Sequence, residues 1–148
     1  RRPEEVISAS NRMVCRIKDA EIFATCCYAV LDLETLEVRW ASAGHLAPLR
    51  LGPDPAYLAT HVGVPLGIDP AAVFEVSAAQ LGELDRLVLF TDGMVEVRDQ
   101  PIEETLTALL VSAAAAPDRP SDIVDWLTAQ APGEDDLAIV CVAPVIPR

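Results

Sequence analysis

The sequence predicts an α+β fold in which antiparallel strands are joined by short turns and helices lie on the faces of the sheets. Three observations support this prediction. Hydrophobic residues make up 51% of a 148-residue chain, which is enough for a buried core. Most apolar runs are short and separated by turns, and short turns join antiparallel neighbours. Helical periodicity is confined to one segment at the start and two near the end, as in folds that segregate helices from strands. We expect a single domain over residues 1–148.

The first expected elements are a helix and a β-hairpin. Pro3 and the two glutamates after it start a helix that should reach about Lys18. Proline suits the first turn, acidic side chains favour the positive end of the helix dipole, and apolar residues recur at helical spacing. The apolar runs 23–33 and 36–42 flank a break at 32–35 and therefore predict a hairpin.

Turns, strands and helices follow along the rest of the chain. In order, we expect a turn at 43–45, a strand at 46–51, loops at 52–55 and 63–67, strands at 73–76 and 87–90, helices at 102–115 and 121–129, and a closing strand at 137–142. Ser121 and Asp122 are expected to cap the last helix, because their side-chain oxygens accept hydrogen bonds from free N–H groups of the first turn.

The formal net charge of −12 at pH 7 limits the classes of partner. Nucleic acids and anionic membranes bind basic surfaces, so neither is an expected partner. No apolar run is long enough to cross a bilayer and no leader pattern opens the sequence, which favours a cytoplasmic protein. An acidic enzyme that acts on a phosphorylated substrate needs cations to offset the repulsion between the two.

The four cysteines, Cys15, Cys26, Cys27 and Cys141, lack the spacing of a zinc site. Cys26 and Cys27 are neighbours in an expected strand, so their side chains point to opposite faces. We expect all four to be small buried hydrophobic residues in a reducing compartment.

Acidic residues stand at the ends of two apolar runs that are far apart in the sequence. Asp92 follows the run 86–90, and Asp135 and Asp136 precede the run 137–140. A carboxylate at a strand end leaves the core while the sheet fixes its backbone, and paired carboxylates suit a hard divalent cation. Each site alone also fits a structural interpretation, an Asp-Gly turn in one case and a soluble loop in the other. Together they favour a metal site.

Other catalytic motifs are absent from the sequence. It contains no Gly-x-Ser-x-Gly, Gly-x-Gly-x-x-Gly or Walker motif, so triad hydrolases, dinucleotide enzymes and nucleotide kinases have no support. The two histidines, His45 and His61, are expected to be turn or surface residues rather than bases or ligands. Arg98 is a weak candidate for steering a phosphate group.

Six short motifs, taken in order and spacing, resemble the SpoIIE-type branch of the bacterial metal-dependent protein phosphatases, the PPM or protein phosphatase 2C-like superfamily. They are residues 23–25 (Phe-Ala-Thr), 31–32 (Leu-Asp), 41–49 (Ala-Ser-Ala-Gly-His-Leu-Ala-Pro-Leu), 64–67 (Val-Pro-Leu-Gly), 87–96 (Leu-Val-Leu-Phe-Thr-Asp-Gly-Met-Val-Glu) and 135–138 (Asp-Asp-Leu-Ala). The resemblance runs from about Pro3 to Val142, which is nearly the whole chain.

This resemblance implies a fold, a reaction and a partner. Members share an αββα sandwich of two antiparallel sheets flanked by helices, with two manganese or magnesium ions between the sheets. By match of motif, Asp92 and Asp135 are expected metal ligands, and Asp136 is the second Asp of the terminal pair. These enzymes dephosphorylate phosphoserine or phosphothreonine in anti-anti-sigma (STAS) proteins through attack by metal-activated water, often downstream of sensory domains.

The chain departs from the family pattern in two places. Leu84 precedes Asp85 where the family usually has glycine. The N-terminal Gly-Asp strand and Asp-x-Ser-Gly-x-Gly turn, which supply the Asp that bridges both metals, have no counterpart here. We therefore expect the C-terminal portion of a phosphatase domain, which by itself binds metal weakly and has little activity. Its uncovered strand edges favour self-association into a homo-oligomer.

Two other interpretations stay open at this point. The chain could be a non-catalytic module that keeps the phosphatase surface and binds a STAS-like or other regulatory partner. A calcium-binding β domain is less favoured, because the sequence lacks the alternating acidic residues of an EF-hand loop.

Overall fold

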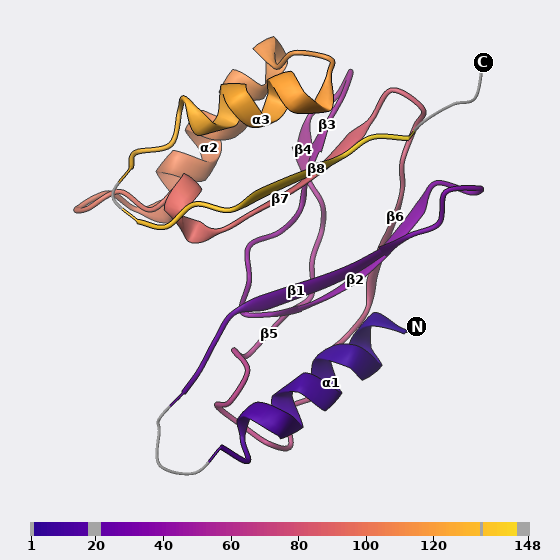
Figure 1. Ribbon diagram of the computed structural model, residues 1–148, viewed down its shortest axis with the longest axis vertical. Coiled ribbons are helices and arrows are strands. Elements are labelled where there is room, and N and C mark those ends of the chain that lie inside the picture. Colours follow the sequence, from indigo (N-terminus) through magenta and orange to yellow (C-terminus); the bar gives the residue numbers. More distant parts are fainter. Residues whose placement is uncertain (1, 18–21, 134, 145–148) are drawn as a thin grey trace. The chain divides into compact units, whose positions relative to one another are not determined.

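The computed structural model describes residues 2–17, 22–133 and 135–144. The chain divides into two compact units, one from Arg1–Ala47 and Ala59–Leu81, the other from Pro48–Leu58 and Gly82–Arg148. Each unit contains one four-stranded sheet together with helical structure (Figure 1), which confirms the expected α+β class. No described helix has both the length and the hydrophobicity needed to cross a membrane.

The first unit contains a helix and four strands. They are α1 (Pro3–Val14), β1 (Cys26–Leu31), β2 (Glu37–Ala43), β5 (Val62–Gly63) and β6 (Ser77–Gln80). The central strand is β2, which pairs antiparallel with β1 and β6 and parallel with β5. The predicted hairpin is therefore confirmed as β1 and β2, and α1 packs on both of these strands (Figure 1).

The helix α1 ends at Val14, before the expected end at Lys18, which lies outside the described residues. The N–H groups of Arg16 and Ile17 donate to the carbonyl oxygens of Met13 and Val14. Each of these bonds joins an N–H to the carbonyl of the third preceding residue, as in a 3₁₀ turn. The α-helix therefore ends in a tighter turn of this type.

A small apolar core holds the first unit together. It consists of Ile7, Ala41, Ala43, Leu66 and Phe74, all buried. The aromatic ring at position 74 fills this core from an irregular segment, so the strand predicted at 73–76 is wrong. The strand in this part of the chain is β6, which follows residues 73–76, is more polar than they are and pairs with β2. Strand formation here depends on pairing with the edge of β2 rather than on hydrophobicity.

The second unit contains a sheet and several helical segments. They are β3 (Leu49–Leu51), β4 (Ala56–Tyr57), β7 (Arg86–Phe90), η1 (Asp92–Met94), α2 (Ile102–Ser112), η2 (Ala113–Ala115), α3 (Pro120–Thr128) and β8 (Ile139–Val142). The strand order is β4-β3-β7-β8, with every neighbouring pair antiparallel. The expected strands at 46–51, 87–90 and 137–142 and both C-terminal helices are present. The first and last of these strands and α2 are shorter than expected, β7 begins one residue earlier, and α3 is shifted by one residue.

The predicted cap of α3 is wrong. The helix begins at Pro120 with Arg119 at the N-cap position and without a side-chain cap. The ring of Pro120 suits the first helical position because that position needs no N–H donor. Ser121 and Asp122 bond to each other instead, with Oγ donating to Oδ1 at 3.0 Å.

The sequence departure at Leu84 has a simple structural solution. The N–H of Asp85 donates to the Gly82 carbonyl oxygen at 3.0 Å, and the Gly82 N–H donates to Asp85 Oδ2 at 2.8 Å. The glycine of this turn therefore stands at position 82, and Leu84 is an exposed residue within the turn.

Candidate metal centre

The end of β7 lies beside the start of β8 within the second unit. Phe90 is opposite Ile139 in the antiparallel ladder, and the next backbone bond runs from the Thr91 N–H to the Ala138 carbonyl oxygen at 3.0 Å. Because antiparallel neighbours place the end of one strand beside the start of the other, Asp92 emerges next to the segment that carries Asp135 and Asp136.

The side chain of Thr91 ties these two segments together. Its Oγ1 accepts a hydrogen bond from the Ala138 N–H at 2.9 Å and donates one to the Asp136 carbonyl oxygen at 3.2 Å. One hydroxyl thus serves as donor and acceptor across the strand ends. The approach to β8 is fixed relative to the turn after β7.

Gly93 allows the backbone of these segments to come close. A Cβ atom at this buried position would lie 2.4 Å from the Asp136 carbonyl oxygen and 3.1 Å from that of Asp135. No side chain fits in this space, so glycine is required by close approach.

A single helical turn carries the chain from Asp92 to Glu96. The N–H groups of Val95 and Glu96 donate to the Asp92 carbonyl oxygen at 2.8 and 2.7 Å. The Val95 carbonyl oxygen accepts a bond of 2.6 Å from Thr105 Oγ1 of α2, and Met94 and Val95 are buried. The turn therefore presents Glu96 on the same side as Asp92, four residues earlier.

Three carboxylates meet at this end of the sheet. One oxygen each from Asp92, Glu96 and Asp135 lies within 4.8 Å of the others, and all three residues are exposed. The prediction that Asp92 and Asp135 converge is confirmed. Asp136 is outside this group among the described residues, and its role as a ligand stays a prediction.

Glu96 is not among the ligands that the sequence predicted. The signal that would have found it is its spacing of four residues from Asp92, combined with the Asp-Gly turn that starts a helical turn.

The chemistry of this donor set fits a hard divalent cation. Carboxylate oxygens are the ligands that Mg²⁺, Mn²⁺ and Ca²⁺ prefer. Three like charges this close repel one another, and a cation between them removes that repulsion. Two of the side chains are also oriented locally, since Asp92 Oδ1 accepts the Gly93 N–H at 3.1 Å and Asp135 Oδ1 accepts the Asp136 N–H at 2.7 Å.

The histidines belong to the first unit. The backbone of His45 is held by Ser42, whose Oγ donates to the His45 carbonyl oxygen and accepts its N–H, at 2.9 and 3.1 Å. His45 Nδ1 lies 3.1 Å from Thr25 Oγ1. His61 is exposed, with Nδ1 3.7 Å from Glu75. Both side chains thus occupy the turn and surface positions that were expected.

The four cysteines are free and half-buried rather than fully buried. Desolvation and the neighbouring Cys26 raise the pKa of the Cys27 thiol to about 11. The thiolate is the nucleophile and the metal ligand, so Cys27 is poorly suited to either role near neutral pH. Arg98, the weak candidate for phosphate steering, is exposed three residues after Val95.

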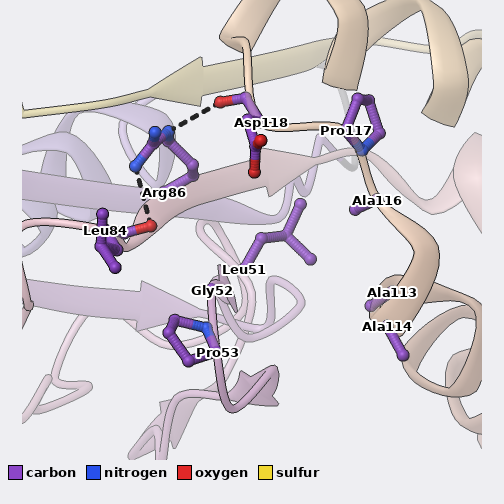
Figure 2. Close-up of a pocket in the computed structure, with 10 residues that line it drawn as sticks. All are labelled: Leu51, Gly52, Pro53, Leu84, Arg86, Ala113, Ala114, Ala116, Pro117 and Asp118. Carbon is purple, nitrogen blue, oxygen red and sulfur yellow. Dashed lines mark hydrogen bonds between the residues drawn. The ribbon is translucent and has the colours of Figure 1, made fainter.

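A separate hollow of about 520 Å³ lies near the start of β7, at the opposite end of this strand from the carboxylates. Figure 2 shows Arg86 bridging its rim, with Nε donating to the Asp118 carbonyl oxygen and one terminal nitrogen donating to that of Leu84. These bonds attach the connection between α2 and α3 to the sheet. The hollow is not part of the carboxylate site.

Comparisons with known proteins agree with this arrangement. The family model for stage II sporulation protein E (SpoIIE) matches residues 1–144. The chain is similar to the RsbU and RsbW domains of Rv1364c from Mycobacterium tuberculosis, with 27% identity and a TM-score of 0.75 over 97% of this chain and 43% of that chain. A search among curated proteins finds no match.

Two further solved structures share the fold. One is the SpoIIE phosphatase domain from Bacillus subtilis, presoaked with manganese, with 20% identity and a TM-score of 0.69 over 97% of this chain and 66% of that chain. The other is RsbX in complex with magnesium, with 17% identity and a TM-score of 0.65 over 93% of this chain and 62% of that chain. The chain thus spans less than two thirds of the length of each of the structures named here.

Proposed function

Because the chain belongs to the SpoIIE family, we propose that it forms part of a metal-dependent protein serine/threonine phosphatase, in which Asp92, Glu96 and Asp135 hold divalent cations. The observation that carries the proposal is the convergence of these three carboxylates within 4.8 Å. They come from segments that are about forty residues apart in the sequence, joined by the β7–β8 ladder.

The three carboxylates act as ligands rather than as bases. A phosphomonoester is an anion, so an acidic surface attracts it only when cations offset the negative charge. Manganese or magnesium, when bound, lowers the pKa of coordinated water and offsets the charge of phosphoryl oxygens. The residues of this chain fix the position of that charge, because Thr91 and Gly93 hold the two acidic segments at a set separation.

The proposed substrate is a phosphorylated STAS protein, with sensory domains upstream in the parent protein and a cytoplasmic location. Similarity to the RsbU and RsbW domains of one M. tuberculosis protein and to RsbX supports a place in this kind of regulation. With a net charge of −12, bound cations rather than a basic surface would attract the phosphorylated substrate.

We also propose that the chain is the C-terminal portion of the phosphatase domain. It spans 43% and 66% of the two neighbours with the highest TM-scores named above. Three carboxylates are a small ligand set for a cation that sheds water reluctantly, so the 148-residue chain should bind metal weakly and turn over slowly.

Titration of the chain with Mn²⁺ in a calorimeter tests the metal site. We expect a dissociation constant of about 10⁻⁴–10⁻³ M, the range of weak oxygen-ligand sites. Replacing Asp92→Asn or Glu96→Gln should weaken binding at least tenfold, because each removes a charged ligand. Glu103→Gln is the matched control, since Glu103 is an exposed glutamate of the same unit outside the cluster. Equal affinity in all four proteins would refute the site.

Hydrolysis of a phosphoserine protein tests the activity separately. The 148-residue chain should show little Mn²⁺-dependent phosphate release, and the longer parent protein should show much more, lost in its Asp92→Asn variant. Metal binding without any hydrolysis by the parent protein would favour the non-catalytic module instead. Rapid hydrolysis by the 148-residue chain alone would contradict the proposal that it is an incomplete domain.

A further inference from the structure

The peptide group between Val95 and Glu96 is held on both of its sides. Its N–H, which belongs to Glu96, donates to the Asp92 carbonyl oxygen at 2.7 Å. Its carbonyl oxygen, which belongs to Val95, accepts a bond of 2.6 Å from the Thr105 hydroxyl of α2. A peptide group is planar and includes the next Cα, so these two bonds fix the plane in which the Glu96 Cα lies. The direction in which this side chain leaves the turn therefore depends on both bonds.

The carboxylate of Glu96 depends on its backbone more than the other two carboxylates of the group do. Asp92 and Asp135 each accept a local backbone N–H with one carboxylate oxygen, at 3.1 and 2.7 Å. Within the described part of the chain, no hydrogen bond of this kind reaches the carboxylate of Glu96. Glutamate also has one more rotatable side-chain bond than aspartate. The placement of the backbone is therefore the main restriction on where this carboxylate lies.

Thr105 differs from the other threonines of the C-terminal helices in what its hydroxyl contacts. Thr107 and Thr128 donate to carbonyl oxygens four residues earlier in their own helices, both at 2.7 Å. This is the ordinary use of a threonine hydroxyl within a helix. Thr105 has such an acceptor in the Ile102 carbonyl oxygen at 2.9 Å, yet the Val95 carbonyl oxygen lies closer, at 2.6 Å. A hydroxyl has one proton to donate, so the shorter contact makes Val95 the main acceptor.

Apolar packing does not fill the space between this turn and α2. A hollow of about 200 Å³ lies there. It is lined by Met94, Val95 and Val97 on the side of the turn and by Thr105, Ala108 and Leu109 on the side of α2. Atoms that line a hollow lack contacts on that side. The hydrogen bond from the Thr105 hydroxyl therefore adds a directional connection where packing is incomplete.

We propose that Thr105 is a positioning residue for the metal site, because its bond to Val95 makes α2 the element that places the Glu96 carboxylate. This inference rests on the proposed function. The site then has two separate supports, since the β7–β8 ladder holds the other two carboxylates together without any contribution from α2. A displacement of α2 would move one carboxylate and leave the other two in place, so this helix is a route through which metal affinity can change.

Titration of the 148-residue chain with Mg²⁺, followed by amide NMR shifts, tests the role of Thr105. This method measures dissociation constants well into the millimolar range, which suits a weak site. Thr105→Val keeps the size of the side chain and removes the donor. It should weaken Mg²⁺ binding about two- to tenfold, the effect of one net hydrogen bond. Thr105→Ser keeps the donor and should bind Mg²⁺ like the wild type.

Two further variants guard against a general loss of structure. Thr107→Val is the matched control, because it removes a hydroxyl bond that stays inside the same helix, and it should leave Mg²⁺ affinity unchanged. Thr105→Ala repeats the loss of the donor with a residue that favours helix formation, and it should weaken binding like Thr105→Val.

Combination with Glu96→Ala shows whether Thr105 acts through the Glu96 carboxylate. Once this carboxylate has been removed, Thr105→Val should have little further effect, so the two losses should not add. An equal fold-loss with and without Glu96→Ala, an equal loss in Thr107→Val, or wild-type affinity in both Thr105→Val and Thr105→Ala would overturn the proposal while the metal site stands. A wild type without any saturable shift would refute the metal site itself, and this inference with it.

Discussion

At the scale of single residues, Thr91, Asp92 and Gly93 have three different tasks in consecutive positions. The Thr91 hydroxyl bonds to the backbone of the segment that leads into β8, as acceptor from one N–H and donor to one carbonyl oxygen. Asp92 supplies a carboxylate, and Gly93 allows close approach to the Asp136 carbonyl oxygen. The structural and metal-site interpretations of Asp92 are therefore compatible. The residue starts a turn with its backbone and joins the carboxylate group with its side chain.

Removing the Thr91 hydroxyl should loosen the carboxylate site. In Thr91→Val the Ala138 N–H loses its acceptor, and we expect a loss of about 1–2 kcal/mol in unfolding free energy. Mn²⁺ affinity should fall several-fold, because the Thr91 side chain no longer holds the segment with Asp135 beside the turn with Asp92. Thr91→Ser keeps the hydroxyl and should retain wild-type affinity. Urea unfolding and calorimetric titration measure both effects, and equal affinity in the valine and serine variants would exclude a positioning role.

A methyl group at position 93 should be more damaging than its size suggests. The Cβ of Gly93→Ala would lie 2.4 Å from a backbone oxygen, which cannot move without displacing Asp136. We expect a loss of about 1–3 kcal/mol, typical of overpacking. The matched control is Gly82→Ala, at a glycine without a positive φ, where the nearest atom to the added Cβ is Asp85 Oδ2 at an ordinary contact distance of 3.5 Å. Thermal unfolding of both variants gives the comparison.

At the scale of elements, the β7–β8 ladder is what turns two separate acidic motifs into one site. The sequence predicts both strands and their acidic ends, because the apolar runs are long enough to recognise. The short strands β4 and β5 were missed, since two residues carry no periodicity. The place of β6 was also missed, because its pairing depends on β2 rather than on its own residues.

The contact between β4 and α2 should be sensitive to alkaline pH. Tyr57 donates its hydroxyl to the Leu106 carbonyl oxygen at 2.9 Å, and burial raises the pKa of Tyr57 from 10 to about 12. A raised pKa means that the folded state holds the proton more tightly, so this stabilisation is present below pH 10 and is lost as the pH rises toward 12.

The variant Tyr57→Phe isolates this effect. At neutral pH it should be less stable than the wild type by about 1 kcal/mol, the usual net value of one hydrogen bond. The difference should shrink above pH 10, where only the wild type has this tyrosine to ionise on unfolding. Urea unfolding of both proteins at a series of pH values measures the difference, and the cysteine thiols titrate equally in both. A constant difference up to pH 12 would contradict the role of burial.

At the scale of the whole molecule, the net charge of −12 dominates the long-range electrostatics. Self-repulsion destabilises a compact chain, and salt screens it over about 10 Å at 0.1 M. The urea midpoint should therefore rise when NaCl replaces low-salt buffer, by an amount that levels off once charges are screened. Caesium chloride and sodium chloride should raise the urea midpoint equally, because screening depends on ionic strength and not on the identity of the cation. A midpoint that falls with salt would indicate that ion pairs, of which those described are mostly exposed, matter more.

The sequence by itself determined the α+β class, the order of the main helices and strands, the family resemblance, and Asp92 and Asp135 as the acidic pair. These depend on local patterns, such as periodicity, turn residues and short motifs, which each segment carries independently. The tertiary structure alone decided that Glu96 joins that pair and that Gly93 is required by a neighbouring carbonyl oxygen. Each of these depends on the distance between segments that are far apart in the sequence. Strand pairing, and not amino-acid composition, sets that distance.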